Sequence, residues 1–278
     1  MQDKILDFLK LKQDISGAHP ERLSSAGVTH QLHTKFIGRK VYYFQKVVST
    51  MDVAMQWVTK GACEGALVLA ETQTKGRGRL GRFWSSPKYK GLYFSLILKP
   101  KILPSEASIF TLMAAVSICE AIKETTELEP QIKWPNDILI QNKKVGGILT
   151  ELDAEMDEVR FLVIGIGLNV NNDKAGIVLG ATSLKEQKKE EINRLSLLQE
   201  ILRRIEDNYL VFQKEGPRPV LKKWRDFNIT LGKRVKVNFH KKHIEGVAVD
   251  IDVDGALLVR DNPGLIHRFT AGDVTICR

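Results

Sequence analysis

The chain has 278 residues, 43% hydrophobic and 27% charged, a composition typical of a soluble protein with room for more than one domain. No run approaches the ~18 apolar residues of a membrane span, and the charged N-terminus lacks the apolar region of a signal peptide, so we expect a cytoplasmic protein. Three widely spaced cysteines exclude a disulfide framework, and the net charge of +9 favours anionic partners, with nucleic acid as one alternative.

The first 35 residues carry the weakest pattern. Ile5, Phe8 and Leu9 predict one short helix, and the stretch 24–27 is typical of a turn. We expect three parts: a short N-terminal segment over 1–35, a main domain over 36–230, and a small domain over 231–278.

Regular elements begin after this segment. Val41 to Phe44 predicts a strand, and the residues from Ser49 to Asp52 open a helix. The Ser-x-x-Asp spacing is typical of an N-cap, so Ser49 has a structural interpretation in which it satisfies free backbone N–H groups. The apolar run 65–70 predicts a second strand.

The segment KGRGRLGRFW, from Lys75 to Trp84, is the most informative part of the chain, and we call it the arginine loop. Glycines let backbone approach a ligand closely, and arginines bind carboxylate and phosphate oxygens. Seven consecutive residues hold three of each: Gly76, Arg77, Gly78, Arg79, Gly81 and Arg82. We expect this loop to become ordered around an anion.

The same glycines satisfy G-x-G-x-x-G, the dinucleotide-binding fingerprint. That fingerprint requires a helix directly after the last glycine. Here Phe83 to Pro87 follows, and then the strand-like stretch from Leu92 to Leu98. A dinucleotide-dependent oxidoreductase is therefore the disfavoured alternative.

Two further motifs follow an apolar helix predicted over Ile109–Ile122, on which Cys119 belongs to the core stripe. In KWPND, residues 133–137, the proline prevents a helix and places the asparagine and aspartate at a strand edge. They form either an Asx-type turn or a ligand-orienting pair. In KVGGIL, residues 144–149, a lysine projects from a strand whose glycines let backbone pass close to a ligand.

The remaining chain predicts packing elements. Phe161 to Gly167 is apolar on both faces, as in a central strand, and Ser196-x-x-Gln199 caps a helix. A linker is expected over 216–230. Alternating apolar residues from Val235 onward, with turns near Gly255 and Gly264, predict five short strands in a small barrel.

In order and spacing, the arginine loop, KWPND and KVGGIL resemble the biotin protein ligases, which attach biotin to carboxylase carrier domains. Ser49-Thr50 ahead of the loop and the stretch 165–170 behind it agree, and the resemblance runs from about Phe36 to the C-terminus. It implies an α+β fold with a central mixed sheet and packed helices, the class II aminoacyl-tRNA-synthetase-like fold of biotin and lipoate ligases. It also implies an SH3-like C-terminal β-barrel.

The resemblance implies a two-step reaction. Biotin's carboxylate attacks the α-phosphorus of Mg-ATP to give biotinyl-5′-AMP and pyrophosphate, and a carrier lysine then takes the biotinyl group. Two like charges at ~4 Å repel by about 4 kcal/mol at an effective dielectric near 20, so cations must offset this repulsion. We expect Arg77, Arg79 and Lys144 to be these catalytic cations.

Further roles follow from the same resemblance. Met51 stands where the common family sequence has an asparagine, so a side-chain hydrogen bond is lost there. Mg²⁺ would come with ATP, with Asp137 as its candidate protein contact and no site made by protein ligands alone. The expected biotin-binding residues are Ser49, Thr50, Met51, Gln73, Gly76, Arg77, Gly78, Arg79, Trp84, Lys144 and Gly146. The expected ATP-binding residues are Arg79, Arg82, Asn136, Asp137 and Asn169.

Two alternatives remain beside a biotin ligase. A lipoate or octanoate ligase has a related fold, but KWPND and KVGGIL argue against it. A DNA-binding regulator of biotin genes needs about three helices and a recognition turn, whereas the first 35 residues have room for one helix. We expect a biotin carboxyl carrier domain as partner, of acetyl-CoA carboxylase or a related enzyme, and neither specific DNA nor membrane binding. A homodimer stays open.

Overall fold

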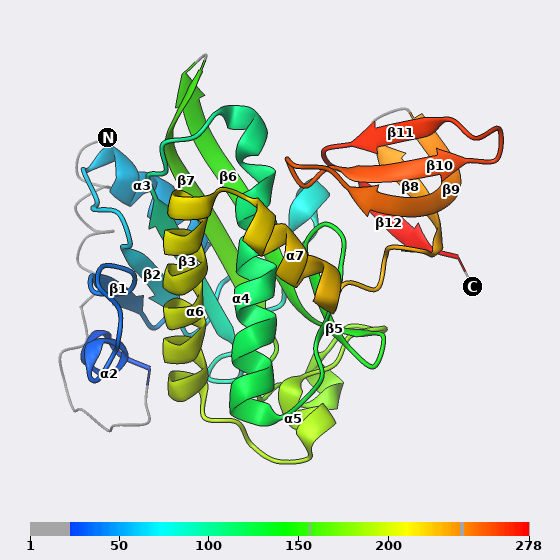
Figure 1. Ribbon diagram of the computed structural model, residues 1–278. Coiled ribbons are helices and arrows are strands. Elements are labelled where there is room, and N and C mark those ends of the chain that lie inside the picture. The colour runs from blue at the N-terminus through cyan, green and yellow to red at the C-terminus, as the bar shows by residue number, and fades with distance from the viewer. Residues whose placement is uncertain (1–22, 156, 240–241, 278) are drawn as a thin grey trace.

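The computed structural model describes residues 23–155, 157–239 and 242–277, so the helix predicted around Phe8 lies outside the described residues. Two sheets form its framework (Figure 1). The larger has seven strands in the order β1-β2-β3-β7-β6-β5-β4, with β1 parallel to β2 and every other pair antiparallel. Its strands are β1 Val41–Phe44, β2 Leu67–Ala70, β3 Leu92–Leu98, β4 Gln131–Lys133, β5 Asp137–Ile140, β6 Lys143–Glu155 and β7 Glu158–Leu168.

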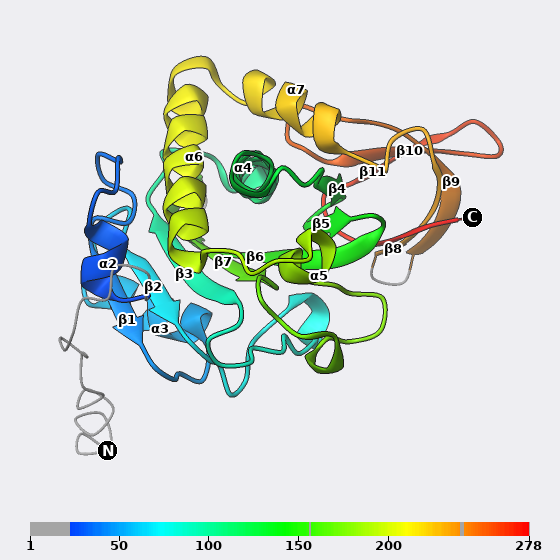
Figure 2. The same cartoon turned by 90° about the horizontal axis from the view of Figure 1, so that it is seen from below.

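Helices cover both faces of this sheet. Figure 2 shows α4 (Ser108–Thr126), α6 (Arg194–Glu215) and α7 (Arg218–Phe227) on one face. Helix α3 (Thr50–Thr59) packs on the opposite face, against β2, β3 and β7. The short helices are α2 (Ser25–Thr29) and α5 (Leu184–Lys188), with single 3₁₀ turns at Arg79–Gly81, Pro104–Glu106 and Lys174–Gly176.

The central strands follow the sequence prediction closely. Strand β3 has the predicted bounds and is buried along its whole length. Phe94 and Leu96 pack toward α4 and α6, whereas Ile97 packs with Val163 on the α3 face. Such strands are buried on both sides, which explains their unbroken apolar runs.

Helix α4 contains the predicted apolar stripe and more. Residues 104–126 reach the length and mean hydropathy of a membrane span, contrary to our expectation from the sequence. The helix nevertheless lies inside the protein, where 72% of its most apolar stretch is buried and Cys119 is fully covered. It is the core helix of a soluble protein.

Three local predictions were wrong. The expected turn at 24–27 opens helix α2, where Ser24 accepts a hydrogen bond from the Gly27 N–H, and residues from Leu23 on pack into the main core. Helix α6 begins at Arg194 rather than at Ser196, because the Asn193 side chain accepts the first free N–H groups. The expected linker contains α7, since a proline is tolerated in the first turn of a helix.

The C-terminal region forms the second sheet, in the order β11-β10-β9-β8-β12. Its five antiparallel strands agree with the predicted SH3-like domain: β8 Arg234–Phe239, β9 Lys242–Ile251, β10 Leu257–Asp261, β11 Ile266–Phe269 and β12 Asp273–Ile276. A buried contact joins it to the main domain, in which the Trp134 Nε1 donates to the Gly255 carbonyl at 3.0 Å. The Trp134 N–H also donates to the hydroxyl of Thr230, the last residue of the main domain, at 2.9 Å.

Candidate functional site

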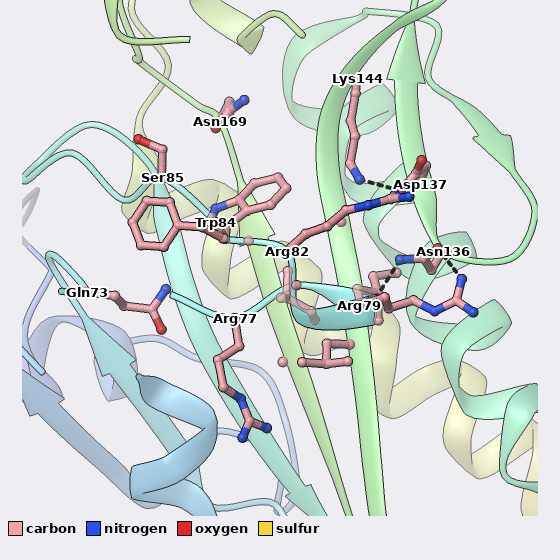
Figure 3. Close-up of a pocket in the computed structure, with 18 of the residues that line it drawn as sticks. Gln73, Arg77, Arg79, Arg82, Trp84, Ser85, Asn136, Asp137, Lys144 and Asn169 are labelled. Atoms are coloured by element: carbon pink, nitrogen blue, oxygen red, sulfur yellow. Dashed lines mark hydrogen bonds and ion pairs between the residues drawn. The ribbon is translucent and has the colours of Figure 1, made fainter. Parts of the chain in front are cut away.

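A cavity of about 240 Å³ lies on the α3 face of the large sheet (Figure 3). Along β7 the residues on this face change from Phe161 and Val163 to Gly165 and Gly167. A Cβ atom at Gly165 would lie 2.5 Å from the Met51 sulfur, and one at Gly167 would lie 2.5 Å from the Trp84 ring. The two glycines therefore make the floor of the cavity, on which Met51 and Trp84 pack.

One end of the cavity is the N-terminus of α3. The predicted capping role of Ser49 was wrong: its side chain makes no cap hydrogen bond, and its buried Oγ has no partner within the described residues. The Gln73 side chain takes this role instead, because its Oε1 accepts the Thr50 N–H at 2.8 Å. Gln73 is itself held by a hydrogen bond to Ser86 at 3.0 Å. Among the described residues, the Ser49 hydroxyl is therefore left unpaired at the cavity.

The arginine loop crosses the cavity as a narrow hairpin. Backbone hydrogen bonds join Gly78 to Arg82 and Trp84 to Gly76, and the turn places Leu80 in the left-handed region at φ 55°. Leu80 and Phe83 are exposed at the mouth, at 72% and 66%. No helix follows the last glycine, so the dinucleotide alternative lacks its structural requirement.

Two arginines of the loop reach the far end of the cavity. The Arg79 guanidinium donates to the Asn136 Oδ1 at 3.0 Å and to the Gly272 carbonyl at 3.1 Å. Burial lowers the pKa of Arg79, although the group stays charged because guanidinium pKa values are so high. Arg82 is ion-paired with Asp273, which raises the pKa of Arg82 and lowers that of Asp273.

Lys144 and Asp137 form the second charged pair at this end. The Lys144 Nζ donates to the Asp137 carboxylate and also lies 5.6 Å from the centre of the Trp84 ring. Trp84 is half-buried, and its Nε1 is covered without a hydrogen-bond partner in the described part of the chain. This placement separates Trp84 from an ordinary core tryptophan.

Arg77 points elsewhere. In Figure 3 its side chain runs away from Lys144 and Asp137. Its guanidinium forms ion pairs with Asp52 on α3, at 3.0 Å, and with Glu151 on β6. The structure therefore brings Arg79, Arg82 and Lys144 together, but not Arg77.

Two asparagines hold the walls in place. The Asn136 Nδ2 donates to the Ile148 carbonyl at 2.9 Å, which ties KWPND to β6. The Asn169 Nδ2 donates to the Thr182 carbonyl at 3.1 Å and closes the loop between β7 and α5. Both residues also line the cavity.

All the predicted site residues line the cavity except two. Gly146 faces the other side of the sheet, because side chains alternate along a strand, and its neighbour Gly147 takes its place. Gly76 lies where the loop crosses itself, and a Cβ atom there would lie only 2.4 Å from the Trp84 carbonyl oxygen. Gly76 thus shapes the loop rather than the cavity surface.

Sequence reasoning missed several parts of the wall. Asp273 comes from the C-terminal domain, and no local pattern marks it. Ile177, Val178 and Ala181 belong to a loop whose sequence shows no motif. The glycines at 147, 165 and 167 could have been predicted, since they belong to KVGGIL and to the stretch 165–170.

A protein-only metal site is not formed by the described residues, where no three His, Cys, Asp or Glu side chains cluster. The sequence contains one closely spaced histidine pair, His240-x-x-His243, of which His240 lies outside those residues. Asp137 offers carboxylate oxygen of the kind Mg²⁺ prefers, and further ligands would have to come from phosphate and water.

Comparison with known proteins agrees with this arrangement. The sequence profile of the Biotin/lipoate A/B protein ligase family matches residues 42–169, and that of the Biotin protein ligase C terminal domain matches residues 230–276. A bifunctional ligase/repressor BirA from Bacillus subtilis is 37% identical over 256 residues, which cover 91% of this chain and 79% of the relative. The chain belongs to the biotin protein ligase family.

Other members support the same placement. The biotin--[acetyl-CoA-carboxylase] ligase of Mycobacterium tuberculosis is 30% identical over 77% of this chain and 80% of its own length. A solved biotin protein ligase from Aquifex aeolicus, in complex with biotin and ATP, superposes with a TM-score of 0.74 at 32% identity. That match covers 86% of this chain and 99% of the Aquifex chain, so the predicted α+β ligase fold is confirmed.

Proposed function

We propose that this biotin protein ligase forms biotinyl-5′-AMP from biotin and ATP and transfers the biotinyl group to a lysine of a biotin carboxyl carrier domain. The observation that carries the proposal is one cavity with two chemically different ends. The α3 end has an apolar floor and the Ser49 hydroxyl, which has no partner among the residues that the structure describes. The far end gathers Arg79, Arg82 and Lys144.

Biotin fits the α3 end. Its bicyclic ring is largely apolar, and its ureido group needs hydrogen-bond partners when buried. Ser49 offers a hydroxyl that no described residue engages, and Met51 and Trp84 offer apolar surface over the glycine floor. Gln73 contributes through Thr50, because it fixes the start of the helix that presents Ser49.

ATP fits the cationic end. The reaction brings a carboxylate against a phosphate, and Arg79 and Lys144 would offset their repulsion in a partly water-excluded site. Mg²⁺ bound to the phosphates would add positive charge there, with the Asp137 carboxylate, beside Lys144, as its protein contact. Positioning and charge then suffice, since the adenylate is already activated toward an amine.

The carrier domain is the partner that this chemistry requires. Its lysine must reach the mixed anhydride between the two ends of the cavity, whose mouth is rimmed by Leu80 and Phe83. Both ATP and the carrier domain are expected in the cytoplasm, so we place this enzyme there as well. Lipoate is the competing substrate.

Mass spectrometry of a carrier domain tests the proposal. The domain is incubated with the protein, ATP, Mg²⁺ and either biotin or lipoate. We expect the gain of one biotinyl group on a single lysine, and no gain when ATP is omitted. An unmodified carrier, or lipoylation at an equal rate, would overturn the proposal.

A further inference from the structure

We propose that Arg77, Asp52 and Glu151 form an ionic latch that holds the arginine loop closed over the biotin end of the cavity. This inference rests on the proposed function and changes the role expected for Arg77. In it, Arg77 is a positioning residue rather than a cation at the phosphate. Asp52 and Glu151 become parts of the biotin site without touching biotin.

The latch joins three separate elements. Arg77 lies on the loop, Asp52 in the first turn of α3, and Glu151 on β6. The Arg77 Nη1 is 3.0 Å from Asp52, and its Nη2 is paired with Glu151. One planar guanidinium can bridge two carboxylates in this way, whereas a lysine would offer a single point charge.

The partners sit beside the cavity wall. Asp52 directly follows Met51, which packs on Gly165, and Glu151 is two residues from Leu149 on the same face of β6. On the loop, Arg77 is bridged to Phe83, next to Trp84. Closing the latch therefore sets the distance between Trp84 on the loop and Met51 on the helix, the two apolar walls proposed to enclose biotin.

The pairing leaves Arg77 poorly placed for phosphate chemistry. Its Nη1 and Nη2 are both engaged by carboxylates, and the side chain runs away from the Lys144–Asp137 pair. A third anion near Asp52 and Glu151 would meet two negative charges. Arg77 also lines the cavity, but its side chain is directed away from the end where Arg79, Arg82 and Lys144 lie.

The latch is built to open. Its side chains are 34% to 39% exposed, so water and salt weaken the pairs. Biotin must enter and biotinylated carrier must leave, which a permanently locked loop would prevent. A weak latch slows escape of the adenylate while allowing the loop to open in each cycle.

Neutral variants of the partners test the latch. We expect Asp52→Asn and Glu151→Gln each to raise the KM for biotin and the release rate of preformed biotinyl-AMP by about threefold, and together by about tenfold, as for exposed ion pairs. The KM for ATP should stay near the wild-type value. Added to Arg77→Gln, the Asp52→Asn change should have little further effect, because the partners act as one unit.

Glu155→Gln is the matched control, since Glu155 lies on the same strand and pairs with Arg160 outside the cavity. Raising the salt concentration should reduce the difference between wild type and the latch variants. The latch is refuted if Asp52→Asn and Glu151→Gln release adenylate at the wild-type rate while Arg77→Gln raises the KM for ATP. A wild-type protein that forms no biotinyl-AMP would refute the proposed function instead.

Discussion

At the scale of residues, two side chains have separate roles at the N-terminus of α3. Gln73 caps the helix, and Ser49 lines the cavity. A serine at the N-cap position normally accepts a backbone N–H of its own helix. Here the Gln73 side chain accepts the first N–H, that of Thr50, and Ser49 makes no cap hydrogen bond. The Ser49 hydroxyl is consequently buried and unpartnered within the described residues, a costly state for a polar group. Such an unsatisfied group is expected where a ligand supplies the missing partner.

This arrangement predicts an unusual outcome for Ser49→Ala. Losing a capping serine typically destabilises a protein by ~1 kcal/mol. Because Ser49 does not cap, we expect the free energy of unfolding in urea to be unchanged or slightly higher. Biotin affinity, measured by calorimetry, should fall by about tenfold, as for loss of one hydrogen bond to a buried ligand. A destabilised variant with normal biotin affinity would return Ser49 to a capping role.

Lys144 carries the second prediction at this scale. Its ammonium is the cation that projects from β6 toward Asp137 and the Trp84 ring. We expect Lys144→Ala to fold normally and to lose ~10²–10³ in the rate of adenylate formation, the usual effect of removing one preorganised charge. ATP–pyrophosphate exchange measures this rate. Lys143→Ala is the matched control, since Lys143 is exposed, and exchange within threefold of wild type for Lys144→Ala would remove Lys144 from the site.

It was easier to predict which residues belong to the site than to predict which way their side chains point. The loop motif identified Arg77, Arg79 and Arg82 together, because composition alone marks an anion-binding segment. Only the tertiary structure separates them, since Asp52 and Glu151 lie far away in the sequence. Gly146 and Gly147 differ for a simpler reason. Successive residues of a strand face opposite sides of the sheet, so only one of the two glycines faces the cavity.

At the scale of elements, a buried charge pair holds the chain on either side of the arginine loop. Glu71 directly follows β2, and Gly91 directly precedes β3. The Arg194 side chain donates to Glu71 at 2.7 Å and to the Gly91 carbonyl at 3.0 Å, with Glu71 almost fully buried. The segments that flank the loop are thus fixed, while the loop itself is held by exposed ion pairs of Arg77 and Arg82, hydrogen bonds of Arg79 and short backbone contacts. We therefore expect motion to be confined to the arginine loop.

Proteolysis can detect this confinement. We predict that trypsin cleaves the free protein within the segment 74–82, where ordering three glycines is entropically costly, and that biotin with ATP protects it. The protection should exceed about fivefold if ligand contacts order the loop. Cleavage elsewhere in the chain, at exposed Lys143 for example, serves as the internal control. Equal rates within 74–82 with and without ligands would show that the loop is already ordered.

At the scale of the molecule, sequence patterns predicted strands of both sheets, and the family resemblance implied the central mixed sheet, but neither predicted how the two domains meet. Alternating apolar residues predicted the strands of the C-terminal barrel, and unbroken apolar runs predicted the central strands β3 and β7. The contacts of Trp134 with Gly255, and of Arg82 with Asp273, join segments that are more than a hundred residues apart. Helix α7 was missed because its prolines stand in the first turn, where they permit a helix.

Specific DNA binding is also considered at the scale of the molecule. The Bacillus subtilis relative is a ligase and repressor, whereas we predicted no specific DNA binding from the first 35 residues. Residues 23–35 pack into the catalytic core through Val28 and Leu32. Gel shifts with biotin-gene promoters at physiological salt test that prediction, and no discrete complex is the expected result. A nanomolar, sequence-dependent band would overturn this prediction.

The contact between Arg82 and Asp273 predicts how pH acts on the domain interface. The hydrogen bond from Arg82 is the main cause that lowers the pKa of Asp273 below its ordinary value of 3.8. A carboxyl whose pKa is lower in the folded state adds stability above the unfolded pKa, and this stability is lost as the pH falls through the folded value. The interface should therefore be unaffected between about pH 5 and pH 8, and weaken only in acid below about pH 4.

Carboxyl-detected NMR titration of Asp273 measures this effect directly. In Arg82→Gln we expect the pKa of Asp273 to rise toward 3.8, because the charged donor is gone. Asp261 is the internal control: His267 is the main cause that lowers its pKa, so its titration should not change. Since Arg82 is 61% exposed, the matching loss of stability at neutral pH should be below about 1 kcal/mol. An Asp273 pKa that is the same in both proteins would mean that the arginine loop and the C-terminal domain are not joined by this pair in solution.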